Sequence, residues 1–502
     1  MASANPANRL MDKRRSGVVL HPTSLPGPGR VGRIGSEAVR FLDWMQASGF
    51  SVWQVLPLNP PQDDGSPYAC ISAFAGDIRL IDPDTLFADG WLAEGGGRMP
   101  LGQALSDARH GLESAGGEDW DEFRAFCAAQ ASWLEDFALF VVIKRLQGNR
   151  PWWTWPEPLR ARDAARLEQL RAEAKEALEA VRFSQFVFFR QWLALRAEAN
   201  ARDILILGDM PIFVAHDSVD VWAHPEYFDL DSQGQPVTVA GVPPDYFSET
   251  GQRWGNPHYR WDRMAEDGFR WWLQRIGWAL EGLDGLRIDH FRGFEAYWSI
   301  PASEPTAIAG SWQPGPGGAL FEAMLQHFGE LPLLAEDLGV ITPEVTALRE
   351  RYGLPGMKIL QFAFDGSPDN PYLPKYHEER CVVYTGTHDN DTTLGWFESL
   401  SEESRAFVLE SLGAEAKDMP WPMIETAFAS PARLAVIPMQ DALALGADAR
   451  MNTPGTTDKN WGWRFDWQDV PAQRAAELRR MNETAGRVVV EGEVGAAETV
   501  TD

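Results

Sequence analysis

The segment Gly285-Leu286-Arg287-Ile288-Asp289-His290-Phe291 is a short apolar run that ends in an arginine and a carboxylate two residues apart. Residues i and i+2 of a β-strand point to the same face, so we expect Arg287 and Asp289 to lie side by side at the end of a buried strand. A neighbouring guanidinium favours the ionised form of a carboxylate. The segment therefore predicts either a structural ion pair or an ionised carboxylate that is available as a nucleophile.

Three other apolar runs also end in a carboxylate. Asp209 ends the run 204–209, Glu336 ends the run 333–336, and Asp389 ends the run 382–389. A structural ion pair does not need further carboxylates at the ends of neighbouring strands, whereas a catalytic site built at several strand ends does. The four acids are therefore the candidate functional residues.

The order of apolar runs and helical patterns predicts the fold class. Eight short apolar runs cover 17–21, 52–57, 204–209, 285–289, 332–336, 358–362, 382–385 and 434–439. Many are separated by helix-like segments at 36–48, 267–280, 318–328, 343–352 and 401–412. Strands that alternate with helices favour parallel βαβ units, and eight of them favour an α/β (β/α)₈ TIM barrel whose active site lies at the C-terminal ends of the strands.

Two spacings are too long for simple connections, and we expect insertions there. The region of about 60–185 contains a strongly helical stretch, 159–182, and predicts a mostly helical subdomain. The region of about 213–262 is rich in Gly, Pro and aromatic residues and predicts a loop that covers the active site. We expect one catalytic barrel over 15–490 and a short acidic tail over 491–502.

Composition narrows the class of protein. The 502 residues carry a net charge of −27, which argues against binding to nucleic acid or to anionic membranes. The three cysteines, Cys70, Cys127 and Cys381, are odd in number and far apart, as in a reducing compartment. The polar N-terminus has no apolar core of a signal peptide, and no stretch approaches the length of a membrane span. These features predict a cytoplasmic enzyme.

Two carboxyl groups that flank a glycosidic bond, about 5 Å apart, can break it with retention of configuration. One attacks as a carboxylate, and the other donates a proton and later accepts one. Asp289 beside Arg287 suits the ionised role, and Glu336 after three apolar residues suits the protonated role. Asp389 would bind sugar hydroxyl groups and favour the cationic transition state.

His290 and His388 adjoin two of these acids in sequence and, as neutral imidazoles, could bind sugar hydroxyl groups. A metal site is the alternative for such Asp and His residues, but the sequence has no HxH or HxxxH pair. We therefore expect no metal at these residues. The structural alternative for each histidine is a buried ring whose hydrogen bonds are satisfied within the protein.

The motifs around these acids resemble those of the 4-α-glucanotransferases, the amylomaltases or disproportionating enzymes of glycoside hydrolase family 77 in the α-amylase clan. The resemblance extends over nearly the whole chain, although residues 85–200 look less characteristic. Its motifs lie at 21–26, 53–57, 208–214, 239–261, 287–293, 335–339, 384–392, 450–452 and 460–461.

The resemblance implies roles for individual residues. Asp289 would be the nucleophile, Glu336 the general acid/base and Asp389 the transition-state stabiliser. The implied substrate-binding residues are Arg287, His290, His388, Asp209, Tyr68, Tyr246, Phe247 and Asn452. Tyr68 looks like the aromatic residue under the donor sugar, and Tyr246 and Phe247 look like residues of a lid on the acceptor side; core packing is the alternative for each aromatic.

The implied reaction breaks an α-1,4 bond in a glucan and passes the donor segment to the 4-OH of another glucan or of glucose. The resemblance implies that this reaction needs no cofactor. The partners would be α-1,4-glucans and maltooligosaccharides, and the oligomeric state stays open. Two alternatives remain: a hydrolase or branching enzyme of the same clan, and a non-catalytic glucan-binding protein. If the lid favours transfer by excluding water, Phe247→Ala should raise hydrolysis relative to transfer.

Overall fold

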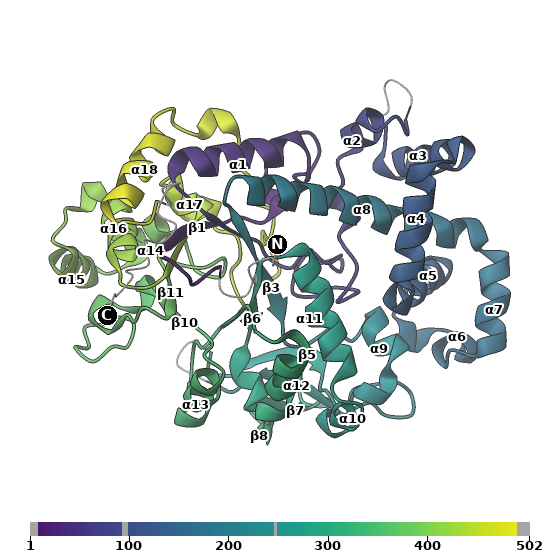
Figure 1. The fold of residues 1–502 in the computed structure, drawn as a ribbon. Helices are drawn as coiled ribbons and strands as arrows, with labels where there is room; N and C mark the ends of the chain where they lie inside the picture. The colour runs from purple at the N-terminus through teal and green to yellow at the C-terminus, as the bar shows by residue number, and fades with distance from the viewer. Residues whose placement is uncertain (1–8, 93–98, 245–247, 489–502) are drawn as a thin grey trace, which may run out of the picture.

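The computed structural model describes residues 9–92, 99–244 and 248–488. Its main sheet has eight strands in the order β10-β11-β12-β1-β2-β3-β6-β9, and every neighbouring pair is parallel (Figure 1). The strands are β1 (Arg15–Val19), β2 (Val52–Gln54), β3 (Leu205–Pro211), β6 (Gly285–Asp289), β9 (Leu333–Ala335), β10 (Gly356–Ile359), β11 (Cys381–Tyr384) and β12 (Leu434–Pro438). Each strand overlaps one of the eight apolar runs.

The two outer strands of this order, β9 and β10, are joined by a backbone hydrogen bond from Ala335 N to Pro355 O of 2.9 Å. The sheet therefore curves until its two outer strands meet, and it forms a nearly closed barrel. Helices cover its outside (Figure 1). The predicted (β/α)₈ barrel is confirmed.

The barrel interior is a packed core. Every second residue of a strand points inward, and an apolar cluster is formed by Val52, Leu205, Leu334 and other such residues from seven of the strands. The N-terminal segment closes the bottom, where a Cβ on Gly285 would lie only 2.3 Å from Leu10 Cδ1. Because the interior is filled, chemistry is left to the C-terminal ends of the strands.

The helices outside the insertions are α1 (Ser36–Ser48), α11 (Arg270–Gly282), α12 (Gly318–Phe328), α13 (Pro343–Arg351), α14 (Thr393–Ser399), α15 (Glu402–Leu412), α16 (Trp421–Ala429), α17 (Met439–Ala442) and α18 (Arg474–Thr484). Five of them, α1, α11, α12, α13 and α15, follow the helical segments expected from the sequence, and four others join them. The helix α1 buries Ala38, Phe41, Leu42 and Met45 on one face, as helical spacing requires, and ends at Gly49, whose φ of 78° suits glycine.

The connection from β2 to β3 is largely helical. It contains α2 (Pro83–Ala88), α3 (Leu101–Ala115), α4 (Glu118–Ala129), α5 (Ala131–Leu146), α6 (Glu157–Arg160), α7 (Ala164–Glu173) and α8 (Lys175–Ala201). The stretch 159–182 is divided among three helices, because Asp163 caps α7 through a hydrogen bond from Arg166 N. The 27 residues of α8 span about 40 Å and connect the inserted helices to β3.

The stretch from 213 to 262 differs from the loop that its composition suggested. It contains α9 (Val219–Ala223), β4 (Thr238–Val242), β5 (Gln252–Pro257) and the start of α10 (Trp261–Glu266). The two strands join β7 (Ala296–Pro301) and β8 (Ser311–Pro314) in a second sheet of order β5-β4-β7-β8. The pairing of β4 with β7 joins residues about 60 apart, so the local pattern did not show it.

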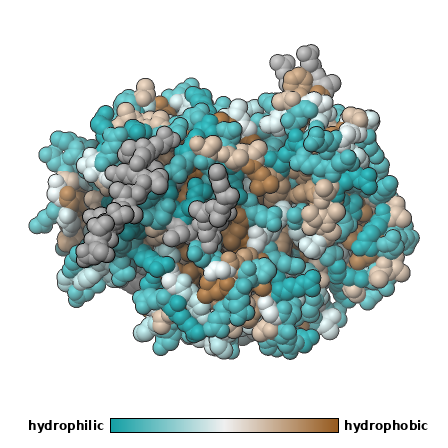
Figure 2. All heavy atoms as spheres, in the orientation of Figure 1, coloured by the Kyte–Doolittle hydropathy of each residue, from teal (hydrophilic) through white to brown (hydrophobic). Residues whose placement is uncertain are grey.

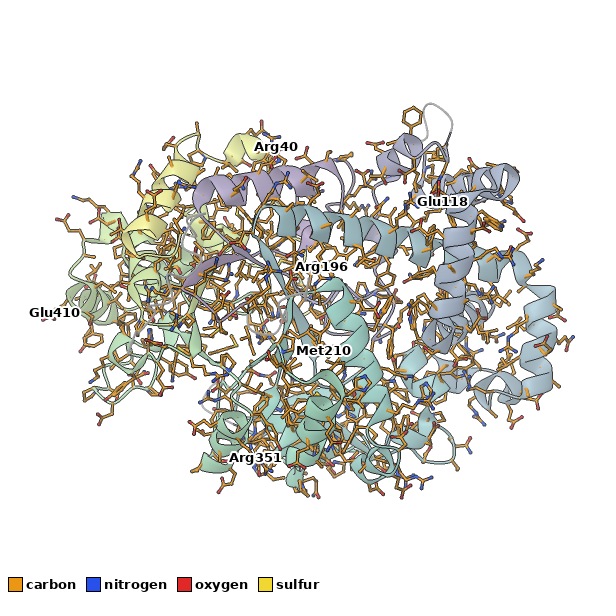
Figure 3. All side chains as sticks on the ribbon, viewed as in Figure 1. Arg40, Glu118, Arg196, Met210, Arg351 and Glu410 are labelled. Atoms are coloured by element: carbon orange, nitrogen blue, oxygen red, sulfur yellow. The ribbon has the colours of Figure 1, made fainter. Side chains whose placement is uncertain are left out.

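The surface is mostly hydrophilic on the face that Figure 2 shows, with hydrophobic side chains gathered near its centre. Figure 3 places Met210 of β3 in the middle of the molecule, whereas Arg351 and Glu410 lie at its edges. Within the described ranges, no single helix is long and apolar enough to cross a membrane. The helices α4 and α5 together, with a bend of 94° between them, would be long and apolar enough, on length and composition only.

Candidate active site

The four acids of the sequence analysis lie at or just beyond the C-terminal ends of barrel strands. Asp209 pairs in register with Arg287 across β3 and β6, and Ile288 pairs with Ala335 across β6 and β9. The next residues along these strands, Asp289 and Glu336, are therefore neighbours at the barrel mouth. Asp389 follows β11 in the loop 385–392.

Arg287 connects two of these carboxylates below the mouth. Its Nη1 lies 2.7 Å from both Asp209 oxygens, and its Nη2 lies 3.0 Å from Asp289 Oδ1. The Arg287 and Asp209 side chains are only 4% and 0% exposed. Although burial alone lowers the pKa of Arg287, the carboxylates of Asp209 and Asp289 raise it well above its usual value. The guanidinium is a permanent cation that fixes the position of Asp289.

Glu336 is held by backbone donors rather than by a cation. Its Oε2 accepts from His290 N at 2.7 Å and its Oε1 from Leu338 N at 2.9 Å. Burial and then the charge of Asp289 raise the pKa of Glu336 to about 7, against the effects of Arg287 and of these two donors. A carboxyl group with this pKa holds a proton near neutral pH and can return it, as general acid/base work requires.

Asp289 departs from the expectation that Arg287 alone governs its charge. Burial outweighs the attraction of Arg287 and raises the pKa of Asp289 to about 6. The charges of Asp209 and Asp389 add to the rise. Asp289 contacts the guanidinium of Arg287 at 3.0 Å, whereas Glu336 is held by neutral backbone N–H groups, so Asp289 is the first of the two to lose its proton.

The side chain of Asp337 points away from the neighbouring acid. Its carboxylate accepts from Met357 N at 2.7 Å and lies 3.1 Å from Arg349 Nε. Asp289, and not Asp337, is therefore the charged neighbour that raises the pKa of Glu336.

His290 follows Asp289 directly in the chain, and its backbone adopts the left-handed conformation, with a φ of 54°. This conformation directs its N–H to Glu336. Burial lowers the pKa of its imidazole to about 3, so the ring is neutral. The buried Nε2 bonds to no described residue, and the ring meets Trp254 edge to face at 4.9 Å.

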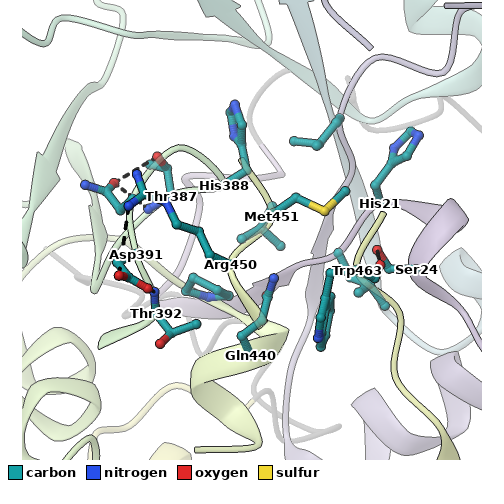
Figure 4. Close-up of a pocket in the computed structure, with 15 residues that line it drawn as sticks. His21, Ser24, Thr387, His388, Asp391, Thr392, Gln440, Arg450, Met451 and Trp463 are labelled. Carbon is teal, nitrogen blue, oxygen red and sulfur yellow. Dashed lines mark hydrogen bonds and ion pairs between the residues drawn. The ribbon is translucent and has the colours of Figure 1, made fainter. Parts of the chain in front are cut away.

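The Asp389 side chain is 46% exposed toward the mouth of the barrel. Its Oδ1 accepts from Asn452 Nδ2 at 2.6 Å and lies 3.3 Å from His388 Nε2. Arg450 donates to the carbonyl oxygen of Asp389 at 2.7 Å. His388 and Arg450 also line a small cavity behind this loop, together with His21, Thr387 and other residues (Figure 4).

Tyr68 reaches the site from the loop after β2. Its hydroxyl group donates to Asp209 Oδ2 at 2.7 Å, and its ring stacks on His388 at 5.1 Å with an interplanar angle of 14°. Burial and then Asp209 raise the pKa of Tyr68 well above its usual value, so the phenol stays protonated. The Tyr68 ring therefore lies beside the acids.

The structure thus brings together Asp209, Tyr68, Arg287, Asp289, His290, Glu336, His388, Asp389 and Asn452. The predicted lid residues Tyr246 and Phe247 lie outside the described residues. Among the residues that the structure describes, no group of three or more His, Cys, Asp or Glu side chains could hold a metal ion.

Sequence reasoning missed Trp254, Trp461 and Arg450 as individual residues. Trp461 packs against both Tyr68 and His388 with ring centroids 5.9 Å apart in each case. Only the quoted motifs 239–261, 450–452 and 460–461 pointed to these neighbourhoods, because nothing in the local pattern separates these residues from core residues.

Comparison with known proteins gives one consistent result. The sequence model described as 4-alpha-glucanotransferase matches residues 20–469. A 4-alpha-glucanotransferase of Thermus thermophilus is 50% identical, with 95% of this chain and 99% of that protein covered. The chloroplastic/amyloplastic 4-alpha-glucanotransferase of Solanum tuberosum is 44% identical, with 95% and 87% covered.

Solved structures agree with the sequence relatives. The amylomaltase from Streptococcus agalactiae in complex with acarbose superposes with a TM-score of 0.91 at 36% identity, covering 95% of this chain and 100% of that one. The amylomaltase from Corynebacterium glutamicum, at 17% identity and a TM-score of 0.76, covers 96% and 76% and shares the fold.

Proposed function

Because this chain belongs to the 4-alpha-glucanotransferase family, we propose that Asp289, Glu336 and Asp389 perform its glucan transfer by a retaining double displacement. The observation that carries this mechanism is the pair of neighbouring carboxyl groups at the ends of β6 and β9. The pKa of Glu336 lies near 7 and above that of Asp289. The two groups therefore suit the proton donor and the nucleophile, respectively.

In the first step, an Asp289 oxygen attacks the anomeric carbon of the donor sugar. Glu336 transfers its proton to the departing glycosidic oxygen, so the leaving glucan ends in a free 4-OH and Glu336 becomes ionised. In the second step, Glu336 removes the proton from an acceptor 4-OH, whose oxygen displaces Asp289 from the anomeric carbon. Two inversions give net retention and restore both carboxyl groups.

The surrounding residues have distinct tasks in this proposal. Arg287 holds Asp289 through its Nη2 at 3.0 Å, while its Nη1 contacts both oxygens of Asp209 at 2.7 Å. Asp389, exposed toward the mouth and held by Asn452, binds sugar hydroxyl groups and favours the positive charge of the transition state. Tyr68 stacks under the donor sugar.

The proposed donors and acceptors are α-1,4-glucans and maltooligosaccharides, and the proposed context is starch, glycogen or maltose metabolism in the cytoplasm. The free cysteines Cys70, Cys127 and Cys381 support a reducing compartment. The net charge of −27 supports a small-molecule or polysaccharide substrate rather than nucleic acid.

The test uses Glu336→Gln with α-maltotriosyl fluoride. Fluoride leaves without a proton donor, so the first step proceeds, while loss of the base slows the second step and the covalent intermediate accumulates. We expect mass spectrometry of a peptic digest to locate one maltotriosyl group on Asp289. The Asp289→Asn variant is the control and should carry none; a sugar on any other residue would refute the assignment.

A further inference from the structure

The loop 385–392 carries His388 and Asp389, and it connects β11 to α14, whose first residue is Thr393. Asp389 lies outside regular secondary structure, and its side chain is 46% exposed. The position of its carboxylate therefore depends on whatever holds the loop.

One buried carboxylate contacts both ends of this loop. Asp441 lies on α17, just after β12, and is 1% exposed. Its Oδ2 accepts from Thr385 Oγ1 and from Thr393 Oγ1, each at 2.6 Å. Its Oδ1 accepts from Thr393 N at 2.7 Å, in the first turn of α14, where a negative charge is favourable.

We propose that Asp441 is a positioning residue that sets the place of Asp389 by tying the two ends of this loop to each other and to the end of β12. This inference rests on the proposed role of Asp389 in catalysis. The segment that follows α17 holds the middle of the loop, where Arg450 binds the Asp389 carbonyl oxygen and Asn452 binds its carboxylate. The exit of β12 thus fixes Asp389 at its backbone, at its side chain and at both ends of its loop.

Asn in place of Asp441 has nearly the same shape but removes the charge and one acceptor. With its Oδ1 on Thr393 N, its Nδ2 would face two threonine hydroxyl groups that now donate to a carboxylate and would have to turn and accept. Hydrogen bonds to a charged group would thus become weaker neutral ones at both ends of the loop. A displacement of about 1 Å in a catalytic group can reduce the rate about 100-fold. We therefore expect Asp441→Asn to lower kcat about 10- to 100-fold.

Asp284 provides a matched control at the other end of the barrel. It is also 1% exposed, and it precedes β6, far along the strand from Asp289. Its carboxylate accepts from Ile206 N at 2.8 Å, Arg196 Nη2 at 2.9 Å and Asn200 Nδ2 at 3.5 Å. Asp284→Asn should lower the thermal stability without lowering kcat.

The experiment measures kcat and KM for maltotriose disproportionation in the full chain, together with the affinity for 1-deoxynojirimycin. The protonated imino sugar imitates the charge of the transition state, whereas maltotriose reports ground-state binding. For Asp441→Asn we expect kcat and imino sugar affinity to fall together, with KM within twofold of wild type. A general loss of stability would not produce this split.

Two outcomes overturn the inference: Asp441→Asn with a kcat within twofold of wild type, or Asp284→Asn with an equal loss of kcat. Asp389→Asn separates this failure from that of the proposed function, because full activity in that variant would refute the role of Asp389 itself. If Asp441→Asn does not fold, the double variant Thr385→Val/Thr393→Val removes two of the three donors and should show the same split.

Discussion

Replacing Asp289 with Asn should make the protein more stable at neutral pH, because the native site disfavours the charge that catalysis needs. The pKa of Asp289 rises from 3.8 to about 6 on folding, and this value already includes the attraction of Arg287. At about 1.36 kcal/mol per unit, the carboxylate destabilises the native state by about 3 kcal/mol. The side chain is 32% exposed, so solvent screening reduces the expected gain to about 1–2 kcal/mol.

The difference in stability between Asp289→Asn and wild type should depend on pH. The native state binds more protons than the unfolded state between pH 3.8 and about 6, so stability falls as the pH rises through that window. Asn cannot ionise. The advantage of Asp289→Asn should therefore be absent below about pH 4 and grow up to about pH 6. It should grow further up to about pH 7, because Asn also removes the charge that raises the pKa of Glu336, and stay constant above that pH.

Differential scanning calorimetry at pH 4.5 and pH 8 tests this prediction. With about 2.1 cal/mol/K per residue for the entropy of unfolding, about 1–2 kcal/mol raises the Tm of this chain by about 1–2 °C at pH 8. The exposed Asp262 offers a control, because Asp262→Asn should leave the Tm unchanged at both pH values. A Tm at pH 8 below that of wild type, or a gain that does not shrink at pH 4.5, would refute the reasoning.

Three further predictions concern activity on maltotriose. The profile of kcat/KM against pH should be bell-shaped. It should fall below about pH 6, where Asp289 gains a proton, and above about pH 7, where Glu336 loses one. A flat profile from pH 5 to 9 would contradict the roles proposed for these two residues. Tyr68→Phe loses the 2.7 Å bond to Asp209 but keeps its ring, and kcat/KM should fall at least about 10-fold, since a hydrogen bond to a charged group contributes about 1.5–3 kcal/mol; an unchanged value would assign Tyr68 to stacking alone. Asn452→Ala frees the carboxylate of Asp389, so kcat should fall about 10-fold with KM within twofold, and a change confined to KM would count against it.

Much of the barrel could be predicted because strands and helices leave local patterns. The apolar run 285–289 became β6 with the same bounds, and the helical segments 36–48 and 318–328 became α1 and α12 unchanged. The inserted regions were harder. The stretch 213–262 showed no clear alternation of polar and apolar residues, and its strands β4 and β5 pair with each other in a sheet that continues from β4 to the distant strand β7.

The sequence by itself determined which acids are the candidates for catalysis, because Asp289, Glu336 and Asp389 each follow an apolar run in a recognisable motif. Only the tertiary structure decided how they are charged and held. Burial outweighs Arg287 at Asp289, and the Tyr68–Asp209–Arg287 chain joins residues up to 219 positions apart (287 − 68). Motifs record local order along the chain, whereas desolvation and hydrogen bonding depend on which distant residues the fold brings into contact.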